Sequence, residues 1–210
     1  MRIPWPFGAR QTAAKVEQAR LPKVVHGSVV VEPDVGTTFM STLPPEEFDG
    51  GSIQLIRWVA DAERHRFGQL PSEAFQGVLV QRGAVRGDLF VANDRFFEFL
   101  QYGMAEIGPA LPEVQNAAQA ARRAGGLNLF IYDARNDDWL KANPLAMPPD
   151  DEAIGLFLVG DGRITAKSYL RNARYNWWSA LGPPQIPVAF RAGLVERLVA
   201  LDAAGRAKPQ

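Results

Sequence analysis

The sequence contains no cysteine, and this absence removes thiol nucleophiles, thiolate metal sites and disulfide bonds together. Only two histidines are present, His26 and His65, and neither has a second histidine at the spacing of a zinc-binding helix. We therefore expect no metal centre and no bound cofactor. A chain without cysteine is compatible with a reducing compartment, and we expect a cytoplasmic protein.

Several other signatures are missing. No apolar run reaches the 18 residues of a membrane span, and the prolines of the opening MRIPWPFGARQTAAK interrupt the apolar run that a signal peptide needs. The phosphate-binding motifs G-x-G-x-x-G and G-x-x-x-x-G-K-[ST] and the serine elbow G-x-S-x-G are absent. We expect no membrane partner, and catalysis has little local support. Frequent alanine, arginine and glycine suggest a bacterial source.

Net charge is also lacking, because lysine plus arginine and aspartate plus glutamate both number 23 among the 210 residues. The two signs are nevertheless separated along the chain: residues 126–162 are acidic, whereas no carboxylate side chain occurs from Gly162 through Val195. Two interpretations stay open. The blocks pair within the fold or face water, or they form a bipolar surface that selects a partner.

The apolar pattern predicts strands near residues 24, 78, 89, 127, 154 and 164, where short apolar or β-branched runs are bounded by glycine or proline. The clearest signal lies at 153–169, where Gly160-Asp161-Gly162 supplies a tight turn between two apolar runs. We expect an antiparallel hairpin there, beside a buried strand at 127–132. Phe157 should then face the core helix described next.

Helical spacing of apolar residues predicts a helix at 53–67 capped by Ser52, an aromatic core helix that begins at Asn93 or Asp94, a surface helix at 113–124 and a last helix from 188 to about 203. The core helix contains Phe96, Phe97 and Phe99. A short helix at 12–20 is a fifth candidate.

These elements show neither an internal repeat nor a regular β–α–β alternation. We therefore predict a single α+β domain with a mainly antiparallel sheet and four to five helices. Residues 1–23 form an N-terminal extension with a short helix, residues 24–204 form the domain, and residues 205–210 form a frayed tail.

Three carboxylates, Asp133, Asp137 and Asp138, follow the predicted strand at 127–132. The end of a buried strand is a position where enzymes place metal ligands or acid–base pairs, so a metal-assisted hydrolase is one hypothesis. A polar turn explains the same residues, because the segment lacks the rhythm of a calcium loop and Arg135 can neutralise a neighbouring carboxylate.

The arm, as we call residues 167–178, alternates basic and aromatic side chains within the acid-free stretch. Arginine, tyrosine and tryptophan are enriched at binding hot spots, and adjacent tryptophans point in different directions. The preferred hypothesis is a non-enzymatic domain that binds a partner protein through Tyr169, Arg171, Arg174, Tyr175, Trp177 and Trp178. Single-stranded nucleic acid is a third hypothesis, opposed by the net charge of zero.

Overall fold

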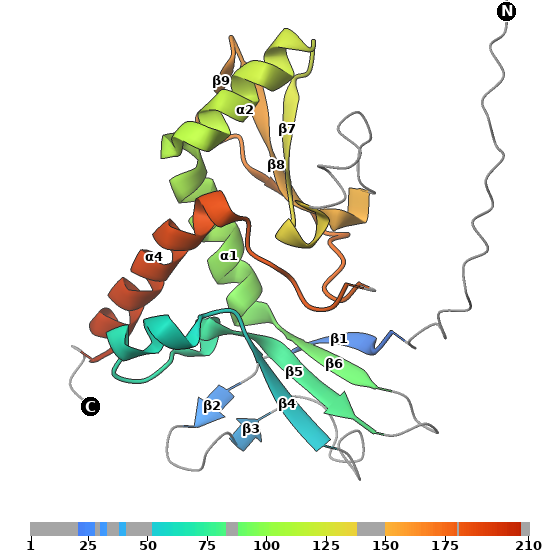
Figure 1. Ribbon diagram of the computed structural model, residues 1–210, viewed down its shortest axis with the longest axis vertical. Coiled ribbons are helices and arrows are strands. Elements are labelled where there is room, and N and C mark those ends of the chain that lie inside the picture. Colours follow the sequence, from blue (N-terminus) through green and yellow to red (C-terminus); the bar gives the residue numbers. More distant parts are fainter. Residues whose placement is uncertain are drawn as a thin grey trace, which may run out of the picture.

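The computed structural model describes residues 21–27, 30–32, 38–40, 52–82, 88–137, 150–179 and 181–206. In these residues two sheets lie on either side of a long helix, α1 (Asp94–Ile107), and a second long helix, α4 (Val188–Arg206), packs beside it (Figure 1). A small antiparallel ribbon is formed by β2 (Val30–Glu32) and β3 (Thr38–Met40). The prediction of a mixed α+β fold with mainly antiparallel strands is confirmed.

The first sheet has the strand order β1-β6-β5-β4. Its central strands β5 (Phe75–Gln81) and β6 (Leu89–Asn93) are almost wholly buried and antiparallel, as the valine-rich sequence predicts. The outer strand β4 (Ser52–Arg57) is antiparallel to β5, and β1 (Lys23–Gly27) is parallel to β6.

The second sheet has the order β10-β8-β7, and β9 (Arg163–Ile164) also pairs with β8. Strand β8 (Ala153–Gly160) is antiparallel to both β7 (Asn128–Tyr132) and β10 (Leu170–Arg171). The turn from β8 to β9 consists of Asp161 and Gly162, whose φ angles of 50° and 76° are those of a tight hairpin. The hairpin predicted beside the strand at 127–132 is therefore confirmed at its turn, but its return strand is shorter than predicted, because β9 ends at Ile164 and pairing with β8 resumes only in β10.

Helix α1 continues directly from β6, and the Asn93 side chain caps it by accepting a hydrogen bond of 3.1 Å from the Arg95 amide. The same buried side chain donates to the carbonyls of Ser72 and Phe75, so one amide group connects the helix start to the neighbouring strand. Helix α2 (Pro112–Arg123) lies where the surface helix was predicted and contacts β7, β8 and β9. Short 3₁₀ helices occupy Asp61–Arg66, Ser72–Ala74, Gly108–Ala110, Ala134–Asn136 and Asp150–Glu152.

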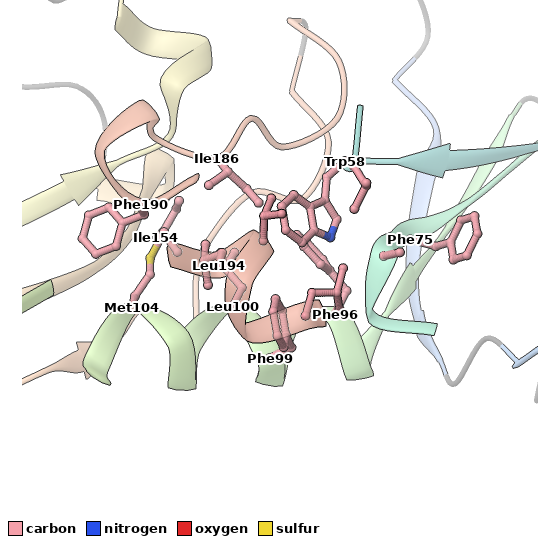
Figure 2. Close-up of a cluster of buried hydrophobic side chains, with 14 of the residues drawn as sticks. Trp58, Phe75, Phe96, Phe99, Leu100, Met104, Ile154, Ile186, Phe190 and Leu194 are labelled. Carbon is pink, nitrogen blue, oxygen red and sulfur yellow. The ribbon is translucent and has the colours of Figure 1, made fainter. Parts of the chain in front are cut away.

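One apolar cluster joins the two sheets through α1 and α4, and Figure 2 shows its centre. Phe96 and Leu100 of α1 are fully buried there, as is Leu194 of α4. The helices approach closely at Gly103, where an added Cβ would lie 2.3 Å from Leu194 Cδ2. Phe157 belongs to the same cluster and lies at the end of α1 beside Gly108, which agrees with its predicted orientation.

Three predictions of the fold need correction. The helix predicted at 53–67 is the strand β4 followed by the 3₁₀ helix Asp61–Arg66, because pairing with the buried strand β5 overrides the helical spacing. The strand at 127–132 is mostly half-buried, with only Ile131 buried. The strands also divide between two main sheets instead of forming one.

The predicted division of the chain falls partly outside the described residues. The short helix within 1–23 and most of the tail at 205–210 lie there, and the single-domain organisation stays a prediction. Helix α4 ends at Arg206, slightly beyond its predicted end. None of the helices in the described part of the chain combines the length and hydropathy needed to cross a bilayer.

Candidate partner-binding surface

The acidic block and the arm meet in a buried polar cluster at the end of β7. The Asp133 carboxylate accepts hydrogen bonds from the Tyr175 hydroxyl, from the Arg135 amide at 2.8 Å, from Arg135 Nε at 2.9 Å and from the Gln185 amide at 2.9 Å. Both ion-pair side chains, Asp133 and Arg135, are fully buried. The charge of each is therefore compensated inside the fold.

The Arg135 guanidinium is satisfied from several sides. Besides Asp133, it donates to the carbonyl oxygens of Gly182 at 2.6 Å and Asn176 at 2.8 Å, and to the hydroxyls of Ser179 at 3.2 Å and Tyr175 at 3.4 Å. Five donors in a fixed fork are thus matched by five acceptors. The cluster fixes the path of residues 175–179 and 181–185, and the second of these segments also reaches the first sheet, where the Gln76 side chain donates to the Pro184 carbonyl.

The three carboxylates that the sequence suggested as a hydrolase site, Asp133, Asp137 and Asp138, are not seen to form a common site among the described residues. Asp133 is enclosed by internal donors, Asp137 is half-buried, and Asp138 lies outside the described residues. In the part of the chain that the structure describes, no three histidine or carboxylate side chains come together as metal ligands. The geometry therefore adds no support to the hydrolase hypothesis.

The aromatic side chains of the arm contribute to the core. Trp177 is 5% exposed and makes edge-to-face contacts with Phe97 at 4.8 Å and with His26 at 5.7 Å between ring centroids. Tyr175 is also buried, and Trp178 is half-buried, 4.8 Å from Phe90.

Tyr169 likewise points inward. It is half-buried, its ring lies 5.0 Å from that of Phe157, and its hydroxyl donates to Gln101 at 2.7 Å. The ring crosses over Gly155, where an added Cβ would meet the hydroxyl at 2.4 Å. Of the six residues proposed from the sequence, Arg171 and Arg174 alone are exposed.

Burial alters the acidity of two of these phenols. Burial raises the pKa of Tyr175 well above its usual range, and the negative charge of Asp133 raises it further. Burial alone raises the pKa of Tyr169. Both hydroxyls therefore hold their protons in the folded protein at a pH where an unfolded chain releases them.

We expect the folded state to lose stability as the pH rises above 10.0, the ordinary pKa of tyrosine. The folded state then binds more protons than the unfolded chain, so linkage gives a loss of about 1.4 kcal/mol per pH unit for each such tyrosine. The loss is absent below that pH. Tyr175→Phe should make the slope shallower by that amount, as measured by urea unfolding at several alkaline pH values. Equal slopes in both proteins would show that Tyr175 ionises as readily in the folded state.

The exposed arginines lie beside an apolar face of the second sheet. Along β8, Phe157 and Val159 point into the core, whereas Leu156 is half-buried and Leu158 is 41% exposed. Leu156 lies opposite Phe130 of β7 and opposite Leu170 of β10, so the three side chains form a row across the strands. Leu170 is 53% exposed.

We call Phe130, Leu156, Leu158 and Leu170, together with Arg171 and Arg174 at one end, the outer sheet face. Its four apolar residues belong to neither of the apolar clusters that make up the core. The inward side chains of the same strands, such as Phe157, belong to the core cluster, and α2 packs against β7, β8 and β9 (Figure 1). The apolar surface of the four outer residues therefore contributes little to folding.

Arg174 is held in place by its neighbours. The Asn172 amide donates to the Ile154 carbonyl at 3.1 Å, and its side chain donates to the Ala153 carbonyl at 2.8 Å. The side-chain oxygen of Asn172 then accepts from the Arg174 amide at 3.0 Å. Because Tyr175, the next residue, is anchored in the buried cluster, Arg174 projects from a short segment that is fixed on both sides.

A shallow cavity of about 270 Å³ opens on the outer sheet face. Its lining consists of Phe130, Ala153, Gly155, Leu156, Leu170, Arg171, Asn172 and Arg174. Two cations and no carboxylate thus surround an apolar floor.

The sequence did not predict that the apolar residues of this face are exposed. A signal was present in β8, whose run of apolar residues is typical of a strand covered on both sides, although only one side of it is covered here. The exposure of Leu170 had no comparable signal, because its partner strand was unknown.

Comparisons with known proteins contribute no further information on this surface. The chain matches no protein-family model, and no curated protein or solved structure shows significant similarity to it.

Proposed function

We propose that this protein is a binding domain that recognises another protein through the outer sheet face. The observation that carries the proposal is the row Phe130–Leu156–Leu170, which lies outside the core clusters and beside an exposed arginine, Arg174, whose backbone is fixed. Antiparallel sheets with one open face usually present polar side chains there. An exposed apolar patch on such a face is typical of a site that binds another molecule.

The arginine and the apolar row have complementary roles in binding. Covering apolar surface supplies free energy of about 25 cal/mol per Å² removed from water. The backbone that carries Arg174 is already fixed, so binding orders only its side chain, whose planar guanidinium loses little freedom for each hydrogen bond it forms. The proposal keeps Arg171 and Arg174 from the sequence hypothesis and replaces the aromatic rings of the arm by the apolar residues of the sheet.

The other two hypotheses have less support from the geometry. A nucleic-acid strand requires exposed aromatic rings as stacking platforms beside the arginines. Within the described residues, the rings of Tyr175 and Trp177 lie in the core instead. A hydrolase requires free carboxylates, and Asp133 is occupied by internal donors.

Photo-crosslinking in cells of the native host tests the proposal. A photoreactive amino acid at position 158 or 170 should give a covalent adduct with another protein, because both positions lie on the outer sheet face. Position 188 is the matched control, since Val188 is 77% exposed at the start of α4, outside this face. Adducts that form equally at position 188, or at none of the three positions, would contradict the proposal.

A further inference from the structure

We infer that the segment recognised by the outer sheet face carries a carboxylate side chain next to apolar side chains and binds in an extended conformation. The inference rests on the proposed function and specifies the chemistry of the partner. It follows from the charge of the cavity lining, the position of the arginines and the spacing of the apolar row.

The positive charge of the residues that line the cavity favours a ligand with a negatively charged group. The lining of the cavity includes Arg171 and Arg174 and no acidic residue, and the Arg171 guanidinium is turned toward Glu98 of α1. Glu152, which precedes β8, is directed elsewhere: it accepts a hydrogen bond from Asn136 at 3.0 Å and lies 3.9 Å from Arg135. An anionic group in the cavity therefore meets the guanidinium of Arg174 without repulsion from an acidic residue of the lining, and it gains Arg171 as well when that residue leaves Glu98.

The two arginines differ in their present partners. Arg171 pairs with Glu98 of α1 at 3.1 Å, but both side chains are well exposed, so the pair contributes little and exchanges readily. Arg174 forms no ion pair with any of the described residues. A carboxylate matches the planar guanidinium through two parallel hydrogen bonds, which makes Arg174 the natural anchor for such a group.

The apolar row sets the form of the segment. Neighbouring strands lie about 4.8 Å apart, so Leu170, Leu156 and Phe130 span about 10 Å, with the arginines at the Leu170 end. In an extended peptide, alternate side chains point to the same side and are separated by about 6.8 Å. An acidic residue two positions from an apolar residue therefore fits the arginines and the row together.

The larger groove between α1 and α4, about 590 Å³, does not share these properties. Its lining combines acids and bases, among them Glu73, Glu98, Arg95 and Arg197. It therefore favours no sign of ligand, in contrast to the cavity on the outer sheet face.

Selection of peptides from a random phage-displayed library on the immobilised full-length protein tests the inference. The selected peptides should be enriched in aspartate or glutamate two positions from leucine, isoleucine or phenylalanine. A synthetic peptide of the selected sequence should bind at least about tenfold more weakly to Arg174→Gln and to Leu170→Ser than to the unaltered protein. Arg163→Gln, which removes an exposed cation from the same acid-free stretch, is the control and should leave its affinity unchanged.

Because all three substitutions are at exposed positions, each variant should fold, and its circular dichroism and melting temperature verify this. Selected peptides rich in lysine or arginine, or binding that is independent of Arg174, would overturn the inference. So would a stable dimer in sedimentation that Leu158→Glu dissociates, since a second copy would then occupy the face. If crosslinks form at position 170 but the peptides are not acidic, the inference fails and the proposed function stands. If no crosslinks form at position 158 or at position 170, the proposed function itself fails.

Discussion

Replacing Arg135 with methionine is expected to lower the free energy of unfolding by about 3–5 kcal/mol, the range for removing one partner of a buried ion pair. The substitution leaves the Asp133 carboxylate buried without its cation, and it frees the carbonyl oxygens of Asn176 and Gly182 from their donor. Urea denaturation at neutral pH measures the loss.

Two further variants define the cause of that loss. Arg174→Met removes an exposed arginine that directly precedes Tyr175 of the cluster, and it should change stability by no more than about 0.5 kcal/mol. Adding Asp133→Asn to Arg135→Met removes the uncompensated charge and should restore part of the lost stability. An Arg135→Met protein as stable as the parent would mean that the cluster does not hold the segment.

Truncating Trp177 to alanine should cost a similar amount, about 3–5 kcal/mol, because it empties a large volume in the core. The indole contacts Phe96 and Phe97 of α1, Tyr175 of the cluster and His26 of β1, so the change loosens three elements at once.

Trp178→Ala is the matched control for this prediction. Trp178 is half-buried and, among the described residues, contacts one aromatic ring, that of Phe90, so its truncation should cost clearly less than that of Trp177. Melting temperatures of the two variants provide the comparison. If Trp177→Ala keeps the melting temperature but loses crosslinking at position 170, Trp177 contacts the partner and its burial here does not describe its role.

The elements that the sequence predicted correctly are those whose signals are local. Asn93 precedes an aromatic helix and caps it, and Asp161-Gly162 supplies the positive φ angles of the hairpin. Both depend on residues that are close in the chain. The helix predicted at 53–67 was wrong because the structure of this segment depends on pairing with β5, about 25 residues away. The helical spacing of Leu55 and Ile56 gives no sign of that pairing.

The candidate surface was predictable to a similar degree. The acid-free stretch drew attention to the segment with Arg171 and Arg174, because charge can be counted along a chain, and the structure places both arginines at the surface. Burial cannot be counted in that way. The sequence reads the same whether the tryptophans and Arg135 face solvent or the core. Trp177 and Arg135 are buried because the arm packs against β7 and α1, a contact between distant parts of the chain.

The separation of the outer sheet face from the core clusters has a consequence for the evolution of the protein. Phe130, Leu156, Leu158 and Leu170 pair through their backbones, but their side chains have no part in the apolar clusters that join the sheets. Substitutions at these four positions therefore escape most of the selection for foldability that acts on residues such as Phe96 and Leu194. Descendants of this chain can exchange one partner for another by changing a few outward side chains, while the scaffold that presents them stays the same.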